Sequence, residues 1–220
     1  MIGQLRPARD SFYTFVFSGI TRFDALILCE GRMDAEVLKE LARKLDVCTS
    51  KSIAVTDCEG IDKLYDVAAA VALLLRISRK LRIIALVVDA DELSPHERAD
   101  SLANSLASRG LRVTGVEEED KQLFSLNIRS AAARVYVAVS AVEEYDFERH
   151  MLEDHVLKLL ELEGRIERGE LKGAATAKEA LARAGFDTLK VLRVASRRRA
   201  VEAFSHMTGL LKLIARDPPE

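Results

Sequence analysis

Continuous apolar runs alternate with helix-like segments through the first half of the chain. Residues 25–29 and 82–88 are apolar at almost every position, and each run is followed by an acidic residue. Residues 34–45 place apolar side chains three and four positions apart, which is the spacing of one helix face. Apolar runs without alternation are typical of strands buried on both faces of a parallel sheet covered by helices. The pattern therefore predicts an α/β domain.

The other segments of this half continue the alternation. Ser94 and Glu97 form a capping box around Pro95, which predicts that a helix begins there. The acidic run at 117–120 is expected to be a solvated loop. Further elements are predicted as strands at 52–55, 111–116, 122–128 and 133–140, helices at 61–80 and 94–108, and an edge strand at 12–17.

The second part of the chain has no strand-like run. Its apolar spacing and its glycines predict helices at 144–164, 175–184 and 188–215. We therefore expect an α/β domain at 1–140, with its core at about 22–116, and a helical C-terminal region at 141–220. The helical region either packs on the sheet or forms a small satellite.

Composition narrows the class of protein. The chain has 220 residues, of which 49% are hydrophobic and 31% charged, and this is the composition of a globular protein. Its formal net charge of −2 excludes a generally basic, nucleic-acid-coating protein, although it allows a local basic patch. The longest apolar run, at 67–75, is too short for a membrane span of about 20 residues. The absence of an apolar signal core predicts a cytoplasmic location, and the scarcity of Asn and Gln points to a thermophilic source.

The cysteines give no sign of a zinc site or a disulfide framework. Cys29, Cys48 and Cys58 are odd in number and show no CxxC spacing. We expect them to be packed thiols.

Two of the buried strands are followed by carboxylates. The strand at 25–29 is followed by Glu30 and, on the first turn of the next helix, by Asp34. The strand at 82–88 is followed by Asp89 and Asp91. Function gathers where parallel strands end, and alternate residues of an extended chain point to the same side. Converging carboxylates repel one another unless a cation lies among them, and oxygen ligands favour Mg²⁺ or Mn²⁺. A single acidic residue after a strand is often only a helix cap or a loop residue, and Asp34 taken alone could equally be one, because aspartate in the first turn of a helix complements the helix dipole.

These motifs resemble those of the Toprim domain, which topoisomerases, bacterial-type primases, RecR-like proteins and overcoming-lysogenization-defect nucleases share. The resemblance lies in LILCEGRMD at 26–34 and ALVVDAD at 85–91, with AVTDCEGIDKL at 54–64 similar to the segment between them. It covers about residues 22–116 and is nearest to small stand-alone archaeal Toprim proteins related to the nuclease branch. It implies a Toprim-like, mostly parallel sheet between helices, followed here by a C-terminal helical region.

The resemblance also implies roles for the four carboxylates. Glu30 would act as general acid or base, Asp89 and Asp91 would bind Mg²⁺ or Mn²⁺, and Asp34 would be a further ligand. The implied activity is divalent-metal-dependent phosphodiester chemistry on DNA or RNA, with nuclease cleavage as the first expectation. The alternative is a non-catalytic nucleic-acid-binding or assembly subunit of a repair or replication complex, as in RecR-like members. Either function allows a protein partner or a homo-oligomer.

The last predicted helix is rich in arginine. Arg193 and Arg197 are four residues apart and would share a face, with Arg198 and Arg199 beside them. One interpretation is contact with the phosphates of a nucleic acid. The other, slightly favoured, is a solvated helix face opposite buried leucines.

A histidine-rich and acidic segment precedes it. His150 and Asp154 are four residues apart and could bind metal, but surface pairs of this kind are common. The resemblance to small Toprim proteins, which often carry an acidic helix in this region, implies that Glu153 could approach the acidic site, although it is kept outside the main set of site residues. His206 is expected at the surface.

Overall fold

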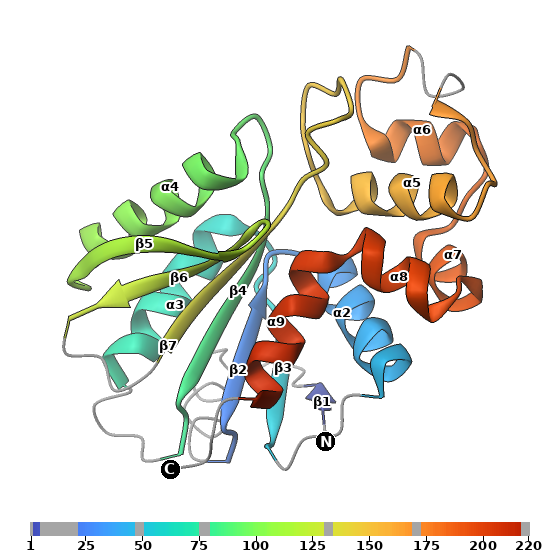
Figure 1. The fold of residues 1–220 in the computed structure, drawn as a ribbon. Helices are drawn as coiled ribbons and strands as arrows, with labels where there is room; N and C mark the ends of the chain where they lie inside the picture. The colour runs from blue at the N-terminus through green and yellow to red at the C-terminus, as the bar shows by residue number, and fades with distance from the viewer. Residues whose placement is uncertain are drawn as a thin grey trace.

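The computed structural model describes residues 2–4, 22–46, 51–74, 80–129, 134–168 and 173–216. A seven-stranded sheet with the order β1-β3-β2-β4-β7-β6-β5 forms its centre (Figure 1). The strands are β1 (Ile2–Gln4), β2 (Ala25–Cys29), β3 (Ile53–Asp57), β4 (Ile83–Asp89), β5 (Val113–Asp120), β6 (Leu123–Ile128) and β7 (Arg134–Ser140). The helices are α2 (Arg32–Leu45), α3 (Ile61–Leu74), α4 (Pro95–Ser108), α5 (Leu152–Leu162), α6 (Ala177–Arg183), α7 (Thr188–Val194), α8 (Arg197–Ala203) and α9 (Ser205–Arg216).

The sheet is mostly parallel. Neighbouring strands β1, β3, β2, β4 and β7 all pair in parallel, and β6 pairs antiparallel with both β7 and β5. The predicted α/β class with a mostly parallel sheet, flanking helices and a helical C-terminal region is thereby confirmed.

Alternation along each strand divides the core into two apolar layers. Ile27 and Ala85 face α2 and the C-terminal helices, whereas Leu28 and Leu86 face α3 and α4. Both sets are buried, which explains why β2, and β4 up to Val88, carry no polar side chains. Figure 1 shows α3 and α4 on one side of the sheet and α2 with α9 on the other.

The C-terminal helices share the core on the α2 side. Phe204, Met207 and Leu211 are fully buried in one cluster with Tyr136 and Ala138 of β7. Helix α9 therefore packs directly on the sheet, and α5 to α8 lie together beside it (Figure 1). Of the two arrangements considered for the helical region, the chain adopts the packed one.

The predicted single helix at 188–215 is wrong, because the segment forms three helices. Ala195 is extended, with φ −63° and ψ 150°, and ends α7, after which the Ser196 side chain accepts a hydrogen bond from the Arg199 amide and begins α8. A third helix starts after Phe204, whose backbone leaves the helical conformation at φ −110° and ψ 45°. The apolar spacing continues through these breaks, so periodicity alone did not reveal them.

Two other boundaries differ from the sequence prediction. The helix expected from 144 begins only at Leu152, because His150 is held in an isolated bridge with Asp91. The acidic run at 117–120 lies in the edge strand β5 rather than in a loop, with its side chains exposed. The predicted strand at 12–17 and Cys48 lie outside the described residues.

The remaining expectations concern helix starts, thiols and histidine. The capping box at Ser94 and Glu97 is present, and Cys29 and Cys58 are buried free thiols. The prediction that His206 lies at the surface is wrong, since this residue is only 1% exposed. No helix in the described part of the chain is both long and apolar enough to cross a membrane.

Candidate acidic site

Glu30 and Asp89 stand at the ends of two adjacent parallel strands. Cys29 of β2 lies opposite Val87 of β4, and the Glu30 amide donates to the Val87 carbonyl at 2.9 Å. The Asp89 amide in turn donates to Glu30 Oε2 at 3.3 Å. The buried register of the two strands thus places both carboxylates at one edge of the sheet.

Asp34 reaches the same edge from the first turn of α2. Its Oδ2 accepts a hydrogen bond from the Gly31 amide at 2.9 Å, while its buried Oδ1 has no hydrogen-bond partner among the described residues. Asp34 is only 5% exposed, so an unpaired oxygen there is costly. A Cβ at Gly31 would lie 3.1 Å from Asp34 Oδ2, which explains glycine at this turn.

A fourth carboxylate comes from the amino end of α5. The Leu152 amide donates to Asp89 Oδ1 at 2.9 Å, so Asp89 lies against the start of this helix. Glu153 follows Leu152 and is half-buried, and its charge raises the pKa of both Asp34 and Asp89. We call Glu30, Asp34, Asp89 and Glu153 the acidic cluster.

Burial and mutual repulsion raise the pKa values of Glu30, Asp34 and Asp89. Burial, followed by the charges of Glu30 and Glu153, raises the pKa of Asp34 to about 7. Burial, followed by the charges of Asp34 and Glu30, raises the pKa of Asp89 well above its usual range. The pKa of Glu30 is also raised by burial, although the Asp89 amide and Arg98 oppose this shift.

Asp91 does not follow the strand geometry assumed from the sequence. Strand β4 ends at Asp89, and Asp91 has a left-handed backbone with φ 56°. Its Oδ2 accepts a hydrogen bond from Arg98 Nη2 at 2.5 Å. The structure thus brings Glu30, Asp34 and Asp89 together and pairs Asp91 with an arginine.

The donor set of the acidic cluster suits a hard divalent cation. Its ligands would be carboxylate oxygens, as Mg²⁺ and Mn²⁺ prefer, and the unpaired Asp34 Oδ1 offers a free acceptor. Among the residues that the structure describes, no three acidic, histidine or cysteine side chains already surround one point closely enough to hold a metal ion. Binding would therefore require rotation of the carboxylates.

The arginine-rich segment lies away from the acidic cluster. Arg197 Nη2 donates to the Leu45 carbonyl at the end of α2 at 2.8 Å, and Arg193 lies 4.0 Å from Glu40 of the same helix. Asp34 and Leu45 are eleven positions apart along α2, or about 16 Å at 1.5 Å per residue. Arg193 and Arg197 belong to different helices, so the expected common face does not form.

Two of these arginines remain on α8. Arg199 Nη1 lies 3.5 Å from Glu202 Oε2, and Arg198 is exposed with no ion pair or hydrogen bond in the described part of the chain. Arg193, Arg197 and Arg199 thus have partners within the protein.

His150 and Asp154 form a pair within the fold. His150 Nδ1 lies 2.7 Å from Asp154 Oδ2, which also accepts from the Val142 amide at 3.2 Å. Asp154 is fully buried, so this pair helps to fix the start of α5 beneath the site. It is therefore not the surface pair that the sequence suggested.

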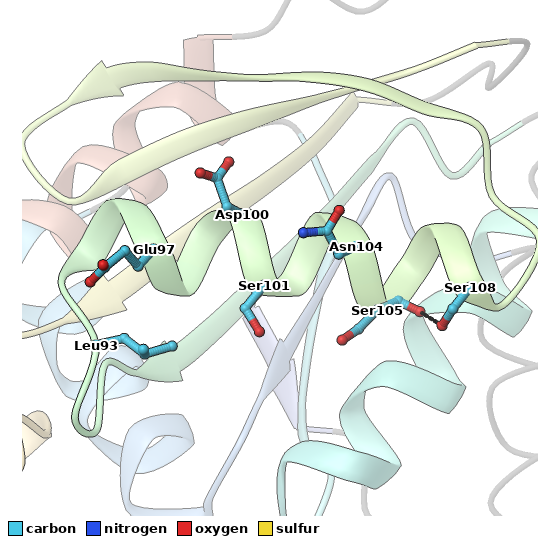
Figure 2. A pocket seen from close by; sticks show the side chains of 7 residues that line it. All are labelled: Leu93, Glu97, Asp100, Ser101, Asn104, Ser105 and Ser108. Carbon is cyan, nitrogen blue, oxygen red and sulfur yellow. Dashed lines mark hydrogen bonds between the residues drawn. The ribbon is translucent and has the colours of Figure 1, made fainter.

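A shallow depression on α4 is separate from the acidic cluster. Figure 2 shows its lining side chains along this helix, with Leu93 from the preceding loop. Most are small and polar, and Ser108 Oγ donates to the Ser105 carbonyl at 2.8 Å. None belongs to the acidic cluster, and the depression has no set of side chains suited to catalysis.

Glu153 was the member of the acidic cluster that the sequence left aside. The available signal was an acidic residue in the first turn of α5, which is common because carboxylates favour helix amino ends. The contact between Leu152 and Asp89, together with the bridge between His150 and Asp91, brings that turn to the site, and nothing in the local sequence specifies these contacts.

Comparison with solved structures finds weak likeness to one protein. The C-terminal region of the Xanthomonas campestris pv. campestris OLD protein, phased with iodine, has a TM-score of 0.38 and 15% identity, covering 87% of this chain and 97% of that chain. The same region phased with mercury has a TM-score of 0.36 and 16% identity, covering 87% and 98%.

The comparisons by sequence give one family. No curated protein matches the chain. The model of a family described as "Protein of unknown function (DUF3226)" matches residues 24–163, which include β2 to β7 and the whole acidic cluster. Because this match spans more than half of the sequence, the chain belongs to the DUF3226 family.

Proposed function

We propose that the chain catalyses divalent-metal-dependent phosphodiester chemistry on nucleic acid, with nuclease cleavage as the reaction. The observation that carries the proposal is the buried Asp34 beside Glu30 and Asp89, with an Oδ1 that has no hydrogen-bond partner among the described residues. A fold that places carboxylates together against their repulsion bears a cost, and a bound cation would remove it.

The side chains divide into two roles in this proposal. Asp34 and Asp89 would hold Mg²⁺ or Mn²⁺, which when bound would neutralise charge on a phosphate oxygen. Glu30 is 21% exposed and therefore accessible to a substrate. Its raised pKa allows it to hold or give up a proton nearer neutral pH than an ordinary glutamate, as a general acid or base must.

The arginine-rich segment would contact a substrate only at a distance from the acidic cluster. A strand of nucleic acid would have to extend over about 16 Å to reach from Asp34 to the end of α2. Arg198, which is exposed, would be the arginine available for phosphate contact. This arrangement suits a polymer better than a mononucleotide.

The test is cleavage of end-labelled single-stranded DNA, duplex DNA and RNA with Mg²⁺, Mn²⁺ or EDTA. We expect products with a divalent ion and none with EDTA. Asp34→Asn and Asp89→Asn should each lower the rate by about 100-fold or more, because each removes a cation ligand while keeping the side-chain shape.

The matched control is Asp62→Asn, which changes an exposed carboxylate in the first turn of α3. It should leave the rate unchanged. Binding of nucleic acid without products under every metal would contradict cleavage and favour a binding subunit. Equal cleavage by Asp34→Asn and the natural protein would contradict the site.

A further inference from the structure

Arg98 is a buried cation at the edge of the acidic cluster. It lies on the first turn of α4 and is only 8% exposed. Its Nε donates to the Asp89 carbonyl at 2.7 Å and its Nη2 to Asp91 Oδ2 at 2.5 Å. The same Nη2 lies 3.9 Å from Glu30 Oε2. One guanidinium therefore contacts both Asp89 and Asp91 and lies near Glu30.

The backbone holds both partners of this ion pair in place. The Asp91 amide donates to the His150 carbonyl at 2.9 Å, and the His150 amide donates back to the Asp91 carbonyl at 2.8 Å. The capping box of Ser94 and Glu97 fixes the start of α4 at Pro95, and Arg98 follows Pro95 by three residues. The pair of Asp91 and Arg98 is thus a built part of the fold rather than a chance surface contact.

Positive charge is unevenly distributed around the four carboxylates of the acidic cluster and that of Asp91. Arg98 forms an ion pair with Asp91 at 2.5 Å and lies at the longer distance of 3.9 Å from Glu30. No ion pair joins Asp34 or Asp89 to a lysine, arginine or histidine within the described ranges, and Asp34 Oδ1 lacks any hydrogen bond there. A divalent cation is therefore expected to bind most favourably beside Asp34 and Asp89, and least favourably beside Asp91.

We propose that the guanidinium of Arg98 takes the place of a metal ion beside Asp91. Asp91 therefore does not bind metal, and the site binds one divalent cation through Asp34 and Asp89. This inference rests on the proposed function and limits it. Arg98 is a positioning residue, since it acts through Asp91 and the Asp89 backbone. Its guanidinium occupies the position beside Asp91 where a second metal would otherwise bind.

The test is titration with Mn²⁺ alone, with free Mn²⁺ followed by electron paramagnetic resonance. We expect one Mn²⁺ per chain. Asp34→Asn should weaken binding by about tenfold or more, whereas Asp91→Asn should stay within about threefold of the natural protein. Two bound Mn²⁺ in the natural protein, or a tenfold loss in Asp91→Asn, would overturn the proposal.

Arg98→Gln gives the opposite readout, a gain of binding. Loss of the guanidinium frees Asp91, so we expect a second Mn²⁺ or binding tightened by about tenfold. Arg109→Gln, which changes the half-buried partner of Asp66 at the other end of α4, should leave Mn²⁺ binding unchanged. If Arg98→Gln fails to fold, Asp91→Asn with Arg98→Gln removes both charges and should bind one Mn²⁺ like the natural protein. Two Mn²⁺ in the double variant would overturn the proposal.

The outcomes separate the two claims. One bound Mn²⁺ without cleavage of any nucleic acid would count against the proposed function and leave the role of Arg98 supported. Cleavage with two bound Mn²⁺ would support the proposed function and overturn the role of Arg98. No binding of Mn²⁺ by any variant would overturn both.

Discussion

Asp34 is a buried carboxylate whose charge opposes folding. Because its pKa is raised to about 7, the folded chain holds a proton that the unfolded chain has released above about pH 4. Stability therefore falls as the pH rises between these values. Without divalent ions at pH 8, Asp34→Asn should raise the free energy of unfolding by about 1–3 kcal/mol, as measured by urea denaturation. The exposed Asp62→Asn should stay within about 0.5 kcal/mol, and a destabilised Asp34→Asn would contradict this account.

Two neighbouring buried histidines respond to pH in the opposite sense to Asp34. The rings of His155 and His206 are buried, with centroids 4.2 Å apart. Burial lowers the pKa of His155 to about 4 and that of His206 well below its usual range, so the unfolded chain binds protons that the folded chain does not. Stability should fall as the pH drops below about 6.5.

Urea denaturation of His206→Met at two pH values tests this effect. Between pH 7 and pH 5 the variant should lose about 1–2 kcal/mol less stability than the natural protein, because one of the two titrating groups is gone. Equal losses would show that His206 does not titrate on unfolding.

At the scale of elements, α7 and α8 are fastened to the far end of α2. Arg197 donates to the Leu45 carbonyl at 2.8 Å, and Lys44 Nζ donates to the carbonyls of Arg193 and Ala195 at 3.0 and 2.8 Å. Cations stabilise the carbonyl end of a helix. Arg197→Met should therefore lower the free energy of unfolding by about 1 kcal/mol. Arg198→Met changes a neighbouring residue that has no partner among the described residues, and it should have no effect in the same denaturation experiment. Equal effects of the two variants would contradict the capping role of Arg197.

The sequence predicts an element best where one local rule decides it. The strands around Ile27 and Ala85 are apolar because both faces are buried, and the helix at Pro95 begins with a capping box, so both were predicted within a residue or two. The breaks at Ala195 and Phe204 depend on packing that periodicity does not carry.

Within the site, the same distinction holds. Glu30, Asp34 and Asp89 follow from strand ends and helix starts, which are local features. The pairing of Asp91 with Arg98 arises from a left-handed backbone and a long-range bridge to His150, neither of which its spacing reveals. Long-range contacts therefore distinguish the observed site from the predicted one.

At the scale of the whole molecule, metal binding should be coupled to stability. A ligand that binds only the folded chain stabilises it by about 2.7 kcal/mol when present at 100 times its dissociation constant. Addition of Mn²⁺ should therefore raise the melting temperature by several degrees for a chain of this size, and EDTA should reverse the change. Asp89→Asn should abolish the shift and Asp62→Asn should keep it. A shift that survives in Asp89→Asn would place the ion elsewhere.

The acidic edge strand β5 has a consequence for self-association. An edge strand presents unpaired backbone groups that can recruit the same strand of another copy and so begin aggregation. Here the final residues of β5 are Glu117, Glu118, Glu119 and Asp120, all exposed. A second copy approaching edge to edge would bring eight carboxylates together, and their repulsion would keep the sheets apart. A polyanion would be repelled from the same edge, so nucleic acid is expected to approach the protein from elsewhere.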